Sequence, residues 1–352
     1  MTFTADRPAL SRAIGFGLGA LTTMAFAPFG LSLLALLLLW PVLFVCVTTS
    51  PRVAAGHLFW FGLGLFLTGT YWIYISVVVF GDAPVWVALL LMFGLSFIMS
   101  LWLYLAGYFI SSLAQGEPWQ LLLAAPAVWA LVEWARGWVL TGFPWLALGY
   151  AKVDSSFGGW APVIGTYGVS FMVVLCAAAA VATVMVDGRQ RLIALGITIA
   201  PWLIGGALTF SEWTEEDGEP VRATLLQYGI TQDQKWLPEN LQPTLDYYRD
   251  ATRIARASDL VVWPEVAVPS LTSNEQALIG QLKSDAREGQ QSIIFGILED
   301  EMYRGKRRVY NSLILLDGSE QQQVYRKRHL VPFGEYFPVP ERVRSWMKMM
   351  SL

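Results

Sequence analysis

The hydrophobic pattern of the sequence changes near residue 211, where long apolar runs give way to short strands and amphipathic helices. Before that point, seven predominantly apolar segments each approach the length of about 20 helical residues that crosses the hydrocarbon layer of a bilayer. They cover residues 11–28, 31–48, 54–78, 84–113, 119–140, 161–186 and 191–210. We therefore predict that residues 1–210 form a transmembrane domain of about seven helices.

The rest of the sequence has the alternating pattern of an α/β layered domain. An acidic linker over residues 211–220 precedes this domain, which we assign to residues 221–352. The pattern predicts strands at 221–229, 259–263, 291–298, 309–316 and 322–328, and helices at 240–257 and 274–288. Functional groups of such domains lie on loops at strand ends, so candidate chemistry is expected there.

Charged residues are distributed as this division predicts. Of the 51 Asp, Glu, Lys and Arg residues in the 352-residue chain, 13 lie in residues 1–210 and 38 in the remaining 142. A content of 55% hydrophobic residues with 16 Trp is ordinary for a membrane protein. The net charge of -3 is too small to indicate a nucleic-acid partner.

The basic residues between the apolar segments predict an orientation, because cytoplasmic loops carry an excess of Lys and Arg. With the N-terminus in the cytoplasm, most of these residues fall in inner loops. The inner ones are Arg7, Arg12, Arg52, Arg189 and Arg191, and the outer ones are Arg136 and Lys152. Seven crossings then place residues 221–352 on the extracytoplasmic face.

The two cysteines, Cys46 and Cys176, both lie inside apolar runs, and the only histidines are His57 and His329. A disulfide or a metal site needs exposed thiols with nearby Cys or His partners. We predict that both cysteines face lipid or the protein core and behave as small apolar residues. We expect no metal and no cofactor.

Glu265 is the first candidate for chemistry. It ends the strand-like run Val261-Val262-Trp263-Pro264-Glu265, in which Pro264 stiffens the turn. Its apolar neighbours predict partial burial, which disfavours the charged form of a carboxyl group and suits a general base. The alternative is a solvated loop carboxylate.

Three further residues accompany it. Because alternate residues of a strand face opposite sides, Lys327 faces away from Arg326 and Arg328. It could hold positive charge against a developing oxyanion, or be one member of a solvated basic run. Glu335 could orient Lys327 or the base, or only cap a loop. Trp236, in a polar loop, could cover the site, contact lipid, or pack over the domain edge.

Two charged residues lie inside the predicted apolar segment 119–140. Glu133 and Arg136 are three positions apart at one helix end, so they could pair on one face. We favour an interfacial ion pair, and the alternative is a polar funnel for a lipid headgroup.

Taken together, these residues resemble a known family, the apolipoprotein N-acyltransferases, which are membrane members of the nitrilase (carbon–nitrogen hydrolase) superfamily. The resemblance extends over almost the whole chain. It is carried by four blocks in this order, behind seven apolar segments: Arg136–Trp145, Lys235-Trp236, Trp263-Pro264-Glu265 and His329–Glu335.

The resemblance implies an αββα sandwich in the periplasm, attached to a multi-pass domain in the bacterial inner membrane. It implies a two-step reaction, in which a cysteine thiolate takes an acyl chain from a phospholipid. The α-amine of a diacylglyceryl-cysteine at the N-terminus of an apolipoprotein then accepts that chain. In this scheme Glu265 is the general base, Lys327 the oxyanion and orientation residue, and Glu335 a supporting acid.

The sequence departs from the family at the nucleophile. The family's cysteine follows the block that ends at Glu335, and neither Cys46 nor Cys176 can replace it, because both lie in predicted spans. We therefore expect a truncated polypeptide whose residues 221–352 are the N-terminal portion of the catalytic domain. Without a nucleophile there is no acyl-enzyme, so the chain alone is expected to be inactive.

Two other functions stay open. A membrane-tethered amidase or nitrilase would transfer the acyl group to water, and an open aqueous pocket would favour it over an acyltransferase with a lipid-facing mouth at Trp236. A transporter or a catalytically dead scaffold is the other alternative. Transport predicts ionisable residues in mid-span, and among Asp, Glu, Lys, Arg and His the residues 11–78 offer only Arg12, Arg52 and His57, each near a segment end.

Overall fold

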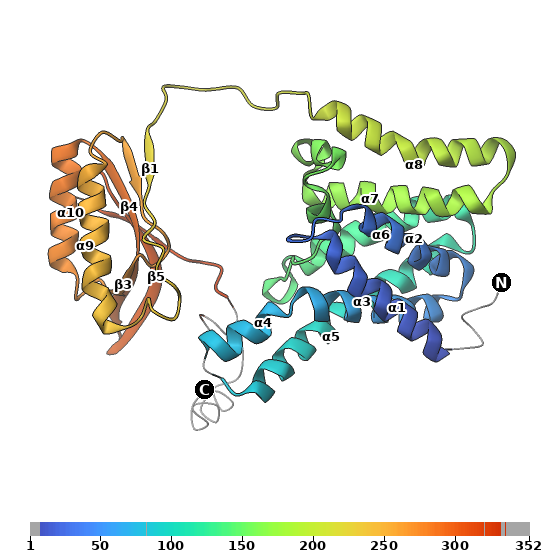
Figure 1. Cartoon of the computed structure of the whole chain (residues 1–352), viewed down its shortest axis with the longest axis horizontal. Coiled ribbons are helices and arrows are strands. Elements are labelled where there is room, and N and C mark those ends of the chain that lie inside the picture. Colours follow the sequence, from blue (N-terminus) through green and yellow to red (C-terminus); the bar gives the residue numbers. More distant parts are fainter. Residues whose placement is uncertain (1–7, 82, 320, 332–334, 336–352) are drawn as a thin grey trace. The chain divides into compact units, whose positions relative to one another are not determined.

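The structure is a computed structural model that describes residues 8–81, 83–319, 321–331 and 335. It divides into two compact units, Met1–Glu215 and Glu216–Leu352. Unit 1 is helical, and unit 2 combines a sheet with helices (Figure 1).

The helices of unit 1 overlap the predicted apolar segments, and two of them share the segment 54–78. They are α1 (Pro8–Thr22), α2 (Leu33–Thr48), α3 (Pro51–Gly69), α4 (Trp72–Ile75), α5 (Val85–Ala114), α6 (Pro118–Arg136), α7 (Ala161–Met185) and α8 (Gly188–Leu208). Short 3-10 turns fill the connection between α6 and α7, at Val139–Thr141, Leu148–Lys152 and Ser156–Trp160.

Length and composition limit which helices could cross a membrane. Among the described residues, three stretches are long and apolar enough, namely Val85–Ala114, Ser156–Met185 and Gly188–Leu208. Pro51–Gly69 together with Trp72–Val79 would make a fourth, with a bend of 44° between them. The seven crossings and the orientation therefore stay predictions.

Helices α1 and α3 approach each other closely because glycines line their contact. A Cβ atom on Gly19 would lie 1.8 Å from the Phe61 carbonyl oxygen, and one on Gly64 would lie 2.0 Å from the Phe16 carbonyl oxygen. Only residues without a side chain permit this backbone distance, as is typical of helices that pack within membranes.

Unit 2 is built on a mixed sheet. Its strands are β1 (Ala223–Leu225), β2 (Leu260–Val262), β3 (Val268–Leu271), β4 (Ser292–Tyr303), β5 (Lys306–Leu316) and β6 (Gln323–Arg326). The order is β1-β2-β4-β5-β6, and β3 pairs with β4 off this path. The pairs among β1, β2 and β4 and the β3–β4 pair are parallel, whereas β5 is antiparallel to β4 and to β6.

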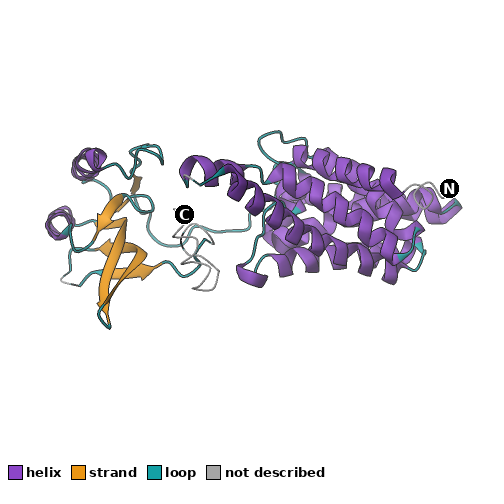
Figure 2. Cartoon of the chain, turned by 90° about the horizontal axis from the view of Figure 1, so that it is seen from below, coloured by secondary structure: helices purple, strands orange, loops and turns teal. Residues whose placement is uncertain are grey.

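Two helices, α9 (Pro238–Ile254) and α10 (Gln276–Gly289), lie on the same side of this sheet (Figure 2). The core between them and the sheet centres on Trp263, which is 1% exposed. Its ring stacks on Tyr248 with centroids 4.8 Å apart, and its Nε1 donates to Thr252 Oγ1 at 3.0 Å. This packing fixes the end of β2, where the candidate site begins.

The structure differs from the sequence prediction at several strands. β1 covers only Ala223–Leu225 of the predicted 221–229, and β5 begins three residues before the predicted 309. β3 was not predicted, because Val268–Leu271 is short and contains Pro269. β4 runs five residues past the predicted end at 298, where its side chains become polar. Those polar residues stay in the strand because their backbone pairs with β5 as far as Tyr303 and Lys306.

Candidate active site

Glu265 lies on a tight elbow at the end of β2. The amide of Trp263 still donates to the Ile294 carbonyl of β4, at 2.8 Å, and the chain then turns at Pro264. Val266 follows with a φ of 47°, a left-handed conformation that is rare for a β-branched residue. A Cβ atom on Gly296 would lie 2.3 Å from the Val266 nitrogen, so only glycine lets β4 pass this close to the elbow.

Glu265, Lys327 and Glu335 meet at one point of unit 2. Lys327 Nζ donates to Glu265 Oε1 at 3.1 Å and to Glu335 Oε1 at 3.0 Å. The carboxylate of Glu335 also accepts from the amide of Val331 at 2.8 Å. The three polar residues selected from the sequence are thus adjacent, and their catalytic roles stay predictions.

Asn311, which sequence reasoning missed, joins the two carboxylates from β5. Its Nδ2 donates to Glu265 Oε1 at 2.5 Å and to Glu335 Oε1 at 2.9 Å. Its carbonyl accepts from the Lys327 amide at 2.8 Å, so the β5–β6 pairing sets Asn311 opposite Lys327. Pairing the predicted strands 309–316 and 322–328 as an antiparallel hairpin would have placed Asn311 opposite Lys327 and so indicated its role.

The contacts within the site shift the pKa values of Lys327 and Glu335 in opposite directions. Partial burial lowers the pKa of Lys327, but hydrogen bonds to Glu335 and Glu265 outweigh it, and the pKa lies above its ordinary value. Partial burial raises the pKa of Glu335, but donors from Val331, Asn311 and Lys327 bring it below its ordinary value. Opposite charges and hydrogen bonds to the charged form explain both directions.

The exposure of Glu265 corrects one expectation. Its side chain is 61% exposed, compared with 29% for Lys327 and 25% for Glu335, so the predicted partial burial was wrong. The apolar neighbours Trp263 and Val266 turn inward at the elbow and leave the carboxylate outside. Trp236, in the loop between β1 and α9, is 50% exposed, and its role as a cover stays a prediction.

The neighbouring Arg326 has different partners, as the alternation of strand side chains predicts. Its guanidinium donates to Glu299 Oε1 at 2.7 Å and to Glu301 Oε2 at 2.8 Å. Lys327 is therefore separate from the basic run around it and is directed to the Glu265 side of the sheet.

The charged pair of unit 1 does not form the favoured ion pair. Both residues are buried, and within the described structure each bonds to neutral groups instead. Arg136 Nη1 donates to the carbonyls of Phe143 and Trp145, at 2.9 and 2.6 Å. Glu133 Oε1 accepts from Trp129 Nε1 at 2.8 Å and from the Leu148 amide at 2.9 Å. The two charges hold the irregular segment after α6 in place.

Lys152, assigned to an outer loop, is also buried. Its ammonium group lies over the rings of Trp202 and Phe157, 4.9 and 5.5 Å from their centroids. Cys46 and Cys176 are each 1% exposed and belong to the hydrophobic core of unit 1, as predicted.

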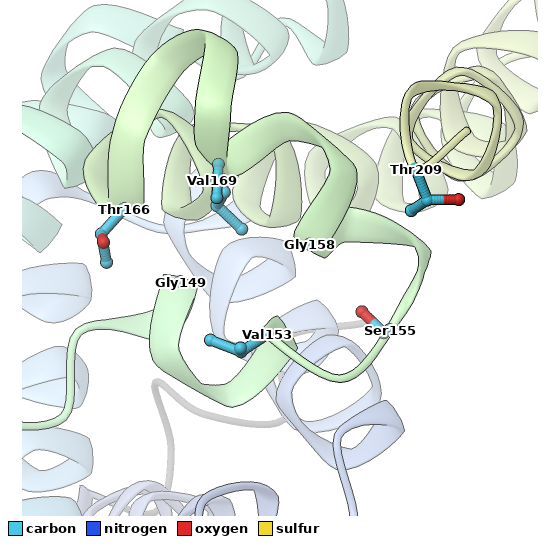
Figure 3. A pocket seen from close by; sticks show the side chains of 8 residues that line it. Gly149, Val153, Ser155, Gly158, Thr166, Val169 and Thr209 are labelled. Atoms are coloured by element: carbon cyan, nitrogen blue, oxygen red, sulfur yellow. The ribbon is translucent and has the colours of Figure 1, made fainter. Parts of the chain in front are cut away.

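A cavity of about 150 Å³ lies in unit 1 between the 3-10 turns after α6 and the start of α7 (Figure 3). It is lined by Gly149, Val153, Ser155, Gly158, Ala161, Thr166, Val169 and Thr209. This lining contains no acidic or basic side chain. Across the described part of the chain, no group of three His, Cys, Asp or Glu side chains is arranged to hold a metal ion.

Two family models match the chain in the order of its units. The model of the apolipoprotein N-acyltransferase N-terminal domain matches residues 18–179, and the model of carbon-nitrogen hydrolase matches residues 222–351. The second match covers Glu265, Lys327, Asn311 and Glu335.

Curated relatives are similar over nearly the whole chain. The apolipoprotein N-acyltransferase of Methylococcus capsulatus is 36% identical over 91% of the chain and 63% of the relative. The apolipoprotein N-acyltransferase of Photobacterium profundum is 34% identical over 95% of the chain and 65% of the relative. The apolipoprotein N-acyltransferase of Pseudomonas syringae pv. tomato is 35% identical over 95% of the chain and 67% of the relative. The chain spans slightly less than two thirds of the length of the first two relatives.

Proposed function

Because the chain belongs to the apolipoprotein N-acyltransferase family, we propose that the complete product of its gene acylates apolipoproteins. It takes a fatty acyl chain from a phospholipid and moves it to the N-terminal amine of diacylglyceryl-cysteine. The observation that carries this proposal is the position of Lys327 Nζ, 3.1 Å from Glu265 and 3.0 Å from Glu335.

The proposed roles follow from these positions. Glu265 accepts the proton of a thiol, and the thiolate attacks the ester carbonyl of the phospholipid. Lys327 stabilises the negative oxygen of the tetrahedral intermediate, while Glu335 holds the ammonium group of Lys327 in place. Glu265 then returns the proton to the departing lysophospholipid. In the second step the acceptor amine attacks the thioester, and its proton passes through Glu265 to the released thiolate. Trp236 contacts the acyl donor.

The proposed reaction also needs a thiol beside Glu265, and residues 1–352 provide none in unit 2. Both cysteines of the sequence are buried among apolar side chains of unit 1. We propose that these 352 residues by themselves do not complete acyl transfer. Acyl transfer to a diacylated lipopeptide by the purified 352-residue chain would contradict this.

The proposed location is the bacterial inner membrane, with residues 1–210 as a domain of about seven spans and residues 211–220 as the linker. The N-terminus is cytoplasmic and residues 221–352 are periplasmic. Alkaline phosphatase, which is active only in the periplasm, tests this when it is fused after residue 331. An active fusion is expected, and an inactive but stable fusion would reverse the orientation.

A second candidate, a membrane-tethered amidase or nitrilase, is favoured by one observation. The side chain of Glu265 is 61% exposed, so water can reach the base directly. Transfer of the acyl group to water would release a free fatty acid in place of an acylated amine.

The deciding experiment uses the complete gene product in detergent, a phospholipid with a labelled acyl chain, and a diacylated lipopeptide. Label in the lipopeptide supports the acyltransferase, and label in free fatty acid supports the hydrolase. If neither product forms while the protein remains folded, the chain belongs to a catalytically dead scaffold.

A further inference from the structure

The carbonyl oxygen of Glu265 has a charged donor of its own. Lys235 Nζ donates to it at 3.1 Å, from a loop 30 positions earlier in the chain. Lys327, in contrast, binds the carboxylate of the same residue. Glu265 is therefore held at two points, its side chain by one ammonium group and its backbone by another.

The loop that carries Lys235 has a defined backbone. The amides of Gln234 and Lys235 both donate to the Thr231 carbonyl, at 3.1 and 3.0 Å. The side chain of Asn240, in the first turn of α9, donates to the Gln234 carbonyl at 2.9 Å. The loop is thus anchored to α9, and Lys235 extends from a fixed point toward the elbow.

The contact of Lys235 with the Glu265 carbonyl lies at a strained part of the elbow. Val266 adopts the left-handed conformation at a φ of 47° and is buried, and its amide nitrogen lies against Gly296. Such a backbone conformation persists only when the surroundings hold it. The peptide group between Glu265 and Val266 is the one whose carbonyl Lys235 binds.

The charge of Lys235 also interacts with the charge of Glu265. Its burial lowers its pKa below the ordinary value, and the negative charge of Glu265 opposes that shift. The ammonium group therefore interacts with Glu265 beyond the single hydrogen bond to its carbonyl.

We propose that Lys235 is a positioning residue for Glu265: it fixes the elbow that aims the carboxylate at Lys327, and it ties the loop of Trp236 to the site. This inference rests on the proposed function for its consequence in catalysis, although the contact itself can be tested without activity. Removing the ammonium group frees the Glu265 carbonyl, so the elbow relaxes and the carboxylate loses its alignment.

The first test uses hydrogen–deuterium exchange on the 352-residue chain in detergent micelles. The reporter is the Ala267 amide, which donates to the Pro264 carbonyl across the elbow at 3.2 Å. K235M should speed its exchange about tenfold, as expected for the loss of one charge-assisted hydrogen bond. K235R keeps charge and donors and should restore slow exchange. The matched control is K306M, at the exposed start of β5.

The second test separates positioning from substrate binding in the complete gene product. A positioning role predicts that K235M lowers kcat about tenfold or more, leaves KM within about twofold, and is rescued by K235R. A raised KM with unchanged kcat would overturn the proposal in favour of a substrate-binding cation. Unchanged Ala267 exchange in K235M would overturn it independently, and that result is interpretable even if no acyl transfer is found.

Discussion

Lys327 and Glu265, 62 positions apart in the sequence, meet with 3.1 Å between Nζ and Oε1. The same ammonium group reaches Glu335 at 3.0 Å, so one positive charge lies between two negative ones. Asn311 donates to both carboxylates from the opposite strand. The arrangement keeps a proton acceptor and a positive charge adjacent, which is what general-base catalysis with oxyanion stabilisation requires.

Asn311 is predicted to align the two carboxylates. N311D replaces a shared donor with a third carboxylate, and like charges at this distance repel. We expect N311D to lower kcat of the complete gene product by about 100-fold, with a smaller loss of about tenfold in N311L, which removes the amide without adding a charge. Steady-state kinetics with the labelled phospholipid measure both values.

The matched control is N274D, which makes the same chemical change at an exposed turn outside the site. It should leave kcat within about twofold of the parent. Equal activity of N311D and N274D would show that Asn311 does not order the site.

Gly296 is predicted to be required by the elbow. A Cβ atom there would lie 2.3 Å from the Val266 nitrogen and 2.6 Å from the Pro264 carbonyl oxygen, and neither backbone atom can move alone. G296A should therefore destabilise unit 2 by about 1–3 kcal/mol, as overpacking of a core does. Limited proteolysis across a temperature series measures this in the intact chain.

The control for this change is G280A on α10, where nothing lies within 4 Å of the added carbon. Alanine is the better helix former, so G280A should be neutral or stabilising by up to about 1 kcal/mol. Similar resistance of G296A and G280A to proteolysis would contradict the close approach of β4 to the elbow.

The pH dependence of stability should contain a contribution from Glu335. Its pKa in the folded protein lies below the ordinary value, so its stabilisation is present above the unfolded pKa and disappears as the pH falls through the folded one. At pH 7 the midpoint of thermal unfolding should be lower for E335Q than for the parent. The difference should shrink as the pH falls below about 4.5. A difference that stays constant from pH 7 to pH 3 would contradict this assignment.

Arg136 is predicted to stabilise unit 1 through the irregular segment after α6. Removing its guanidinium leaves the Phe143 and Trp145 carbonyls without their charged donor, at a cost of about 3 kcal/mol. R136M should lower the unfolding midpoint in detergent, and R136K should lower it less. R189M, at an exposed position, serves as the control. Equal unfolding midpoints for R136M and R189M would show that the segment after α6 does not depend on Arg136 for its stability.

Much of this organisation could be predicted from the sequence because hydrophobic pattern and strand ends are local signals. The apolar runs correspond to helices. Glu265 was selected because it follows a strand, and Lys327 because alternate residues of a strand face opposite sides. Asn311 was missed since its importance depends on the pairing of β5 with β6, which places it opposite Lys327. A single asparagine in a strand carries no such signal by itself.

Burial was harder to predict than position. Glu265 was expected to be partly buried because its neighbours are apolar, but Trp263 and Val266 are buried while the carboxylate between them is exposed. Lys152 shows the converse, since aromatic side chains 5 and 50 positions later enclose a residue that the charge pattern assigns to a loop. Both outcomes depend on tertiary contacts that a local pattern does not contain.

The central claim is that Glu265 acts as the base of an acyl-transfer site, and its direct test is the rate of acyl transfer by E265Q in the complete gene product. Glutamine keeps the size of the side chain and cannot accept the proton, so the rate should fall by at least about 100-fold. E239Q, at the exposed start of α9, should retain the parental rate, and the unfolding midpoint of E265Q should show that it is folded. A rate for folded E265Q within about threefold of the parent would contradict the account.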